Sequence, residues 1–216
     1  MLVRLQNNQL ENFDKYISLP VGRKMFRAQL NMYRISHKKV MSKQSFVTLK
    51  SLIWKILDKM DHIEGRSMYE SFKQTQDYEE SRKPSFVSDD QRERIETCMD
   101  CMIMSDTFCY QIDQTNKVFL HSSIKYHPMW QNNDYWVEVI IHSIREEINK
   151  NSINPEDIQD ILNPDDVMSI VETKLNWFIH NMVSFHIGFH NIQSIVRTIA
   201  MMYCLPESRY KVNLLF

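Results

Sequence analysis

Two cysteines separated by two residues are the first groups in this chain whose type and spacing could do chemistry. Cys98 and Cys101 form a C-x-x-C, a spacing found in redox and zinc-binding proteins. A redox pair needs a thiol at a helix N-terminus, whereas this pair falls in the middle of a predicted helix. A zinc site needs further ligands; Cys109, His121 or His127 could be proposed, but their spacing matches no common zinc module. We therefore interpret the pair as core residues, and keep a thiol- or zinc-dependent enzyme as an alternative.

Three histidines near the C-terminal end form a second group that could bind a metal. His186 and His190 lie four residues apart, and His180 is close by. However, Gly188 falls between the first two, and the glutamate of an H-E-x-x-H motif is missing. The spacing favours ordinary histidines at helix ends, so we predict no metal site and no cofactor.

The usual signatures of hydrolytic catalysis do not occur in this chain. There is no G-x-S-x-G, and only three glycines occur, at positions 22, 65 and 188. The adjacent carboxylates Glu146-Glu147 and Asp165-Asp166 fall at predicted helix ends or on solvated faces. The sequence thus predicts no catalytic residue, and we expect a protein that is not an enzyme.

Aromatic residues around a predicted helix–helix connection are the best candidates for a binding surface. Aromatic side chains beside a connection often anchor protein interfaces. We name Trp130, Tyr135 and His127 as candidate partner-binding residues. The alternative is that they fill the joint between two helices, which is the expected role of Trp136 and leaves Trp130 the more open question. For His127, the favoured interpretation is that it caps or packs at the turn before Pro128.

The composition is that of an ordinary globular protein. The 216 residues are 43% hydrophobic and 25% charged, and 26 Lys and Arg offset 27 Asp and Glu. This balance argues against a nucleic-acid partner or an acidic membrane. No transmembrane stretch and no signal peptide are visible, so we expect free thiols and a cytoplasmic location. The initial methionine favours a complete chain.

Apolar residues recur every three or four positions through most of the chain, which predicts helices. In residues 21–36, Met25, Phe26, Gln29, Leu30 and Tyr33 lie mostly on one side, the expected inward one. On the remaining sides, Arg23, Lys24, Arg27 and Arg34 are expected to extend their charged ends into water. Gly188 is the expected left-handed residue that ends one of the long helices. The predicted helices cover residues 10–17, 21–36, 42–60, 88–110, 117–126, 133–151, 155–162, 164–187 and 191–205.

These helices predict an all-α fold: eight or nine helices packed as antiparallel pairs in an irregular bundle. No strand-like alternation competes with the helical pattern. Residues 65–87 are polar, so we predict a connection there that is mobile in part. We expect residues 1–216 to form a single domain.

Several short motifs of aromatic and turn residues resemble a known helical family. They are G-R-x-x-F at Gly22, Arg23 and Phe26; F-x-x-L at Phe46 and Leu49; M-x-x-T-F-x-Y at Met104, Thr107, Phe108 and Tyr110; P-M-W at Pro128, Met129 and Trp130; and Y-W at Tyr135 and Trp136. Together they resemble the SET-binding-factor domain of myotubularin-related pseudophosphatases and related small cytosolic proteins. The chain departs from that pattern at Cys109, which intervenes before Tyr110, and in its longer connection at 65–87.

This resemblance implies a non-catalytic protein-binding or scaffold module. The implied partner is a protein, either a small GTPase or a trafficking factor. A helical GTPase regulator with exchange or GAP-like activity is the alternative in the same setting. The motifs carry no catalytic residue over to this chain, and the oligomeric state stays open.

Overall fold

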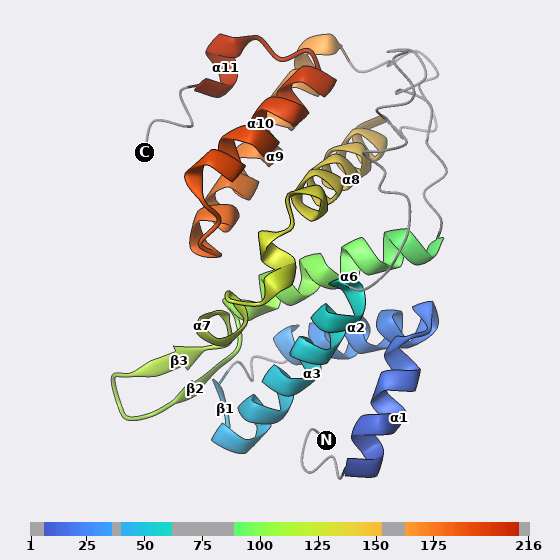
Figure 1. The fold of residues 1–216 in the computed structure, drawn as a ribbon, viewed down its shortest axis with the longest axis vertical. Coiled ribbons are helices and arrows are strands. Elements are labelled where there is room, and N and C mark those ends of the chain that lie inside the picture. Colours follow the sequence, from blue (N-terminus) through green and yellow to red (C-terminus); the bar gives the residue numbers. More distant parts are fainter. Residues whose placement is uncertain (1–6, 36–39, 62–88, 153–162, 212–216) are drawn as a thin grey trace. The chain divides into compact units, whose positions relative to one another are not determined.

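The computed structural model of this protein describes residues 7–35, 40–61, 89–152 and 163–211 (Figure 1). Within these ranges the chain is predominantly helical, which confirms the predicted all-α class. The helices are α1 (Asn7–Ile17), α2 (Pro20–Ile35), α3 (Lys43–Asp61), α6 (Asp89–Ser105), α7 (His121–Ile124), α8 (Asn133–Ser152), α9 (Pro164–Ser184), α10 (Phe189–Met202) and α11 (Glu207–Lys211). A 3-10 helix, η1, covers Pro128–Gln131. The predicted helix at 155–162 and connection at 65–87 lie outside the described residues.

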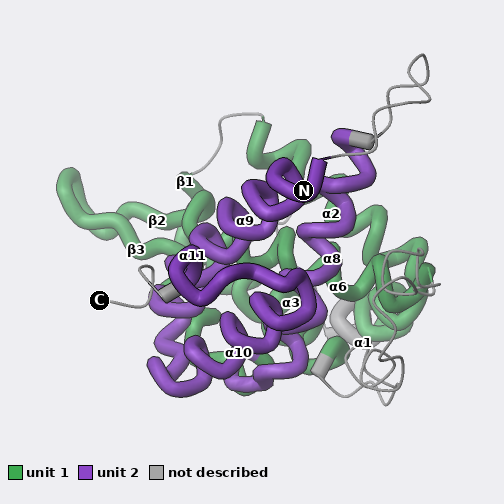
Figure 2. Tube along the Cα trace, turned by 90° about the horizontal axis from the view of Figure 1, so that it is seen from above, with its two compact units in different colours: residues 1–66, 75–129 green, residues 67–74, 130–216 purple. Residues whose placement is uncertain are grey.

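The chain divides into two compact units, which Figure 2 shows in different colours. Unit 1 comprises residues 1–66 and 75–129, and unit 2 comprises residues 67–74 and 130–216. Two compact units can belong to one domain or to two, so the single-domain prediction stays a prediction. Among the described helices, none combines the length and apolar character that crossing a membrane requires.

Unit 1 is built around helices α2, α3 and α6. Helix α2 packs against α1 and α6, while α3 packs against α6 and α7. The apolar residues Leu49, Ile53, Ile56 and Leu57 recur at helical spacing along α3 and form a fully buried stripe. This stripe supplies much of the apolar core of the unit.

A small three-stranded sheet in unit 1 corrects the prediction that the chain lacks strands. Its strands are β1 (Val40–Met41), β2 (Cys109–Gln111) and β3 (Lys117–Phe119), in that order across the sheet. Strand β1 runs parallel to β2, and β2 runs antiparallel to β3. The predicted helix at 88–110 was therefore wrong at Cys109 and Tyr110, and the one at 117–126 was wrong at Lys117–Phe119. Strands of two or three residues are too short to show an alternating pattern.

The turn between β2 and β3 is organised by one carboxylate, that of Asp113. Its Oδ1 accepts hydrogen bonds from the backbone N–H groups of Thr115 and Asn116, each at 2.9 Å. Its Oδ2 accepts a hydrogen bond from the Asn116 side-chain amide at 2.7 Å. Such local bonds replace the glycine that a tight hairpin usually requires.

Unit 2 contains helices α8, α9 and α10, which pack against one another. Helix α9 begins as predicted, because the Asn163 side chain accepts a hydrogen bond from the Asp165 backbone N–H and Pro164 is the first helical residue. The buried residues of α9 include Val171, Leu175 and Phe178.

Helix α9 ends differently from the prediction. The left-handed residue is His186, with φ of 59°, whereas Gly188 has φ of −60° and precedes α10. The Ile187 N–H donates to the Met182 carbonyl and the His186 N–H donates to the Val183 carbonyl, which is the Schellman arrangement. Ile187 is buried, and its burial requires the chain to turn at His186, two residues before Gly188.

Helix α10 ends in the same way. Cys204 is left-handed, with φ of 52°, the Leu205 N–H donates to the Ala200 carbonyl, and the Cys204 N–H donates to the Met201 carbonyl. Leu205 is buried, as Ile187 is after α9. Two helices of unit 2 therefore end in Schellman motifs without glycine.

Candidate interaction surface

The thiols of Cys98 and Cys101 lie in the core of unit 1, as the sequence predicted. They are 2% and 0% exposed, and the Cys98 sulfur lies 3.8 Å from that of Met129. Burial, followed by the neighbouring Cys98 and Asp100, raises the pKa of the Cys101 thiol well above its usual range. Within the described ranges, neither thiol belongs to a cluster of three metal-ligating side chains. Cys101 is therefore held as a neutral thiol, which is a poor nucleophile and a poor ligand.

The three histidines lie at helix ends, as predicted, and are exposed. His180 lies near the C-terminal end of α9, His186 lies two residues beyond that end, and His190 lies in the first turn of α10. The paired carboxylates also have structural surroundings. Glu147 forms an ion pair of 3.0 Å with Lys174, which lowers the pKa of Glu147, and Asp165 lies in the first turn of α9.

Trp130 and Tyr135 belong to an aromatic cluster in unit 2 rather than to an open surface. Trp130 and Trp136 are both 0% exposed. The ring centroid of Trp130 lies 4.7 Å from that of Phe185 and 5.5 Å from that of Tyr135. The Trp136 indole N–H donates to the Trp130 carbonyl at 2.7 Å, so Trp136 fills the joint as expected. The ring of Trp130 is thus occupied by packing, and only Tyr135 is half-buried.

His127 is 1% exposed and packs at the turn into η1, where both of its ring nitrogens are engaged. Nδ1 accepts a hydrogen bond from the Met129 backbone N–H at 3.2 Å, so Nε2 carries the proton and lies 3.0 Å from an Asp58 carboxylate oxygen. The ring centroids of Trp54 and His127 lie 4.6 Å apart. Neither nitrogen offers a lone pair to a substrate. A partner-binding role for His127, Trp130 and Tyr135 stays a prediction, and two of these side chains are not accessible.

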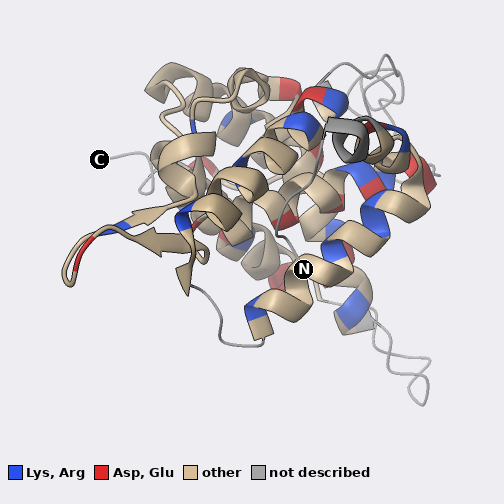
Figure 3. Ribbon diagram, turned by 90° about the horizontal axis from the view of Figure 1, so that it is seen from below, with Lys and Arg blue, Asp and Glu red and all other residues tan. Residues whose placement is uncertain are grey.

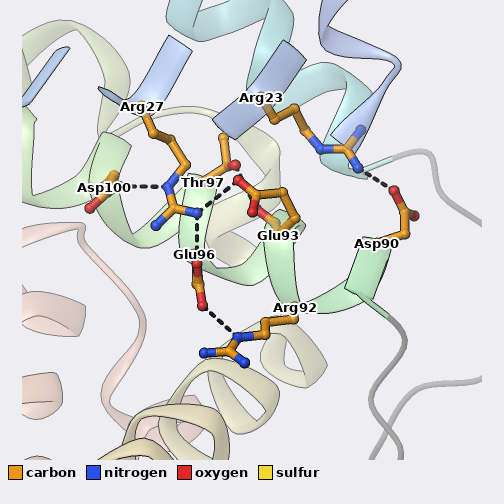
Figure 4. A network of polar contacts seen from close by, with 8 residues as sticks. All are labelled: Arg23, Arg27, Asp90, Arg92, Glu93, Glu96, Thr97 and Asp100. Carbon is orange, nitrogen blue, oxygen red and sulfur yellow. Dashed lines mark hydrogen bonds and ion pairs between the residues drawn. The ribbon is translucent and has the colours of Figure 1, made fainter. Parts of the chain in front are cut away.

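A polar network joins α2 to α6 (Figure 4). The Arg27 guanidinium donates to Asp100 and Glu96 at 2.7 Å and to Glu93 at 2.8 Å. Burial lowers the pKa of Arg27, and the bonds to Asp100, Glu96 and Glu93 raise it by more, so it lies above its usual range. Glu96 also pairs with Arg92 at 2.8 Å. The network fixes α2 on α6, and its charged groups are engaged with one another.

Arg23, one turn earlier in α2, is 1% exposed and completes the attachment of α2. It donates to the carbonyls of Ile17 and Ser18, at 3.0 and 3.1 Å, and forms an ion pair with Asp90. These bonds satisfy carbonyl groups at the end of α1 that have no partner within the helix. The G-R-x-x-F motif therefore has a structural explanation in unit 1.

The opposite face of α2 carries an exposed row of apolar side chains, which we call the α2 stripe. Val21, Met25, Met32 and Ile35 are 60%, 53%, 63% and 69% exposed, and Ala28 between them is also exposed. Their spacings are four, three, four and three residues, which keeps them on one side of the helix. The α2 stripe lies away from the buried side, which carries Gly22, Arg23, Phe26 and Leu30.

Sequence reasoning missed the α2 stripe and wrongly placed Met25 on the inward side. Helix α2 has apolar residues on two faces. Because the residues of both faces recur every three or four positions, the spacing alone does not show which face is buried. The placement of Arg23 on the solvent side was wrong as well, because Arg23 is 1% exposed and lies opposite the stripe. Basic and acidic residues are interspersed along α3, α6, α8 and α9 (Figure 3).

Within the described residues, the fold and this surface define only a broad class, a helical protein with an exposed apolar face on α2. Comparisons of the chain with protein-family models, curated proteins and solved structures gave no match. The resemblance to the SET-binding-factor domain therefore stays a prediction that rests on the motifs.

Proposed function

We propose that this chain is a non-catalytic protein-binding module whose contact surface is the α2 stripe. The observation that carries the proposal is the exposure of Val21, Met25, Met32 and Ile35 along one side of a single helix. Apolar area in water costs about 25 cal/mol per Å² relative to buried area. A continuous apolar row is typical of surfaces that contact another protein, whereas scattered exposed residues need no explanation.

The surroundings of the candidate catalytic groups support a binding role over an enzymatic one. Cys98 and Cys101 are buried, and both nitrogens of His127 are engaged. These observations weigh against the alternative of a thiol- or zinc-dependent enzyme. A Cys101→Ser variant that stays folded and keeps its binding partners would remove that alternative.

The proposed setting is the cytoplasm, in membrane trafficking or small-GTPase regulation, and it derives from the family resemblance. A GTPase regulator with exchange or GAP-like activity is the second candidate in this setting. It predicts that the chain changes the nucleotide turnover of a small GTPase. A pure binding module predicts association without that change.

The test is affinity capture from a cell lysate that also contains an untagged copy of the chain. The baits are the wild type, a Met25→Glu/Met32→Glu variant, and a Met201→Glu control. Met201 is 72% exposed on α10, so it matches the stripe methionines in type and exposure but lies in unit 2. Circular dichroism checks that all three baits keep their helices.

We expect at least one protein, the untagged copy included, to be retained by the wild type and by Met201→Glu and to be lost from the stripe variant. Each such protein is then purified and its Kd for the three baits is measured directly. Equal retention by all three baits, or retention of nothing specific, would refute the proposal that the α2 stripe is a protein contact.

A further inference from the structure

We propose that the occupant of the α2 stripe is the α2 stripe of a second copy of this chain, packed antiparallel about a two-fold axis near Ala28. This inference rests on the proposed function, because it takes the α2 stripe to be a protein contact. It goes further by naming the partner and the register of the contact.

The spacing of the α2 stripe is that of a helix-pairing seam. Alternating steps of four and three residues average 3.5, the repeat at which two helices stay in contact along their length. From Val21 to Ile35 the stripe is about 21 Å long, at a rise of about 1.5 Å per residue. It covers almost the whole of α2, so a straight partner helix of similar length fits it.

The order of side chains in the α2 stripe is self-complementary. Read from either end, the row gives a β-branched residue, methionine, alanine, methionine and a β-branched residue. A two-fold axis near Ala28 places Val21 opposite Ile35 of the second copy and Met25 opposite its Met32. A two-fold interface requires this kind of match, because the same patch is used on both sides. The small Ala28 lets the two helices approach closely where they meet.

The charges of α2 permit this pairing although the helix has four cations and no acid. Arg23 and Arg27 bond to acids of α6, on the side away from the seam. At about 100° per residue, Lys24 lies at the edge of the stripe and Arg34 lies further round. Antiparallel pairing about Ala28 separates the two Lys24 positions by about 12 Å along the axis, about a Debye length. Antiparallel helix dipoles are favourable as well.

The first experiment is sedimentation velocity on the purified full-length chain under reducing conditions. We expect a reversible monomer–dimer equilibrium for the wild type and Met201→Glu, and a monomer for Met25→Glu/Met32→Glu. A small interface binds weakly, so concentrations extend to about 300 µM. A wild type that stays monomeric throughout, or a stripe variant that dimerises equally well, would overturn the proposal. A monomeric wild type with stripe-dependent capture of another protein would leave the proposed function standing.

The second experiment tests the register by cross-linking with a short bismaleimide. The background is Cys204→Ser, since Cys204 is exposed while Cys98, Cys101 and Cys109 are buried. In this background we expect A28C to form a dimer with itself, and V21C to cross-link with I35C when the two are mixed. We expect V21C alone to give no dimer. A cross-linked V21C dimer would show parallel pairing. An A28C variant that gives no cross-linked dimer would show that no two-fold axis lies near residue 28. Either result contradicts the proposal.

Discussion

Gly22 sets how closely α2 can approach the end of α1. A Cβ added at this residue would lie 1.9 Å from the Tyr16 carbonyl oxygen, a backbone atom that cannot move alone. We therefore expect Gly22→Ala to lower the free energy of unfolding by about 3 kcal/mol, the range of overpacked sites. Urea denaturation followed by circular dichroism measures this.

Gly188 provides the matched control for Gly22. An added Cβ there meets nothing within 4 Å, and its φ of −60° suits any residue. Gly188→Ala should change the free energy of unfolding by less than about 1 kcal/mol. Similar effects of the two substitutions would show that the contact with Tyr16 is unimportant.

The left-handed residues that end α9 and α10 are places where the native residue costs stability. A residue with a Cβ pays about 1 kcal/mol in this conformation, which glycine avoids. Cys204→Gly should raise the free energy of unfolding by about 0.5–1 kcal/mol, and hence Tm by about 2 °C. Differential scanning calorimetry checks this. A lower Tm for Cys204→Gly would contradict the assignment.

At the scale of elements, the contact between α2 and α6 depends on Arg27. Replacement by methionine leaves Glu93, Glu96 and Asp100 close together without their shared cation. We expect Arg27→Met to lower the free energy of unfolding by about 2 kcal/mol, and Arg27→Lys by about half as much because it loses the forked geometry. Urea denaturation measures both. Arg34→Met on the same helix is the control, expected within about 0.5 kcal/mol of the wild type; equal losses at both arginines would refute the role of Arg27.

The turn between β2 and β3 predicts a dependence on pH. The Asn116 amide first, and then backbone N–H groups of Thr115 and Asn116, hold the pKa of Asp113 well below its usual range. A carboxylate with a depressed folded pKa stabilises the fold above its unfolded pKa of about 3.9, and this contribution is lost as pH falls through the folded pKa. The amide NMR shifts of Thr115 and Asn116 should therefore titrate well below pH 3.9. Asp113→Asn should abolish this titration; a midpoint near 3.9 would contradict the bonding described.

The sequence predicted the long helices well because their signals are local. Asn163-Pro164 marks the start of α9, and the stripe around Ile53 marks the buried face of α3. The sheet was missed because its strands are only two or three residues long, and because the pairing of β1 with β2 joins residues distant in sequence, as in Val40 with Cys109. The candidate surface was missed for a related reason: Met25 and Phe26 both fit a helical period, and only the packing of α1 and α6 decides which is covered. The burial of Trp130 could not be predicted, because its sequence neighbours are polar and only the fold brings its ring against that of Phe185.

At the scale of the whole molecule, the two compact units pose a question that a fragment can answer. Helices α8, α9 and α10 have buried side chains that pack within unit 2, including Trp136, Phe178 and Ile195. We expect residues 130–216 expressed alone to keep their helical circular dichroism and to unfold cooperatively. A fragment without a thermal transition would show that the units fold only together, as the single-domain prediction implies.

The division into units has a practical consequence for spectroscopy. Of the four tryptophans, Trp54 lies in unit 1, whereas Trp130, Trp136 and Trp177 lie in unit 2. A Trp54→Phe variant would thus emit only from unit 2, and its difference from the wild-type spectrum would isolate the emission of unit 1. Among the three emitters of unit 2, Trp177 is 40% exposed and open to quenching by acrylamide, whereas Trp130 and Trp136 are shielded. The chain thereby carries its own optical labels for following each unit through an unfolding experiment.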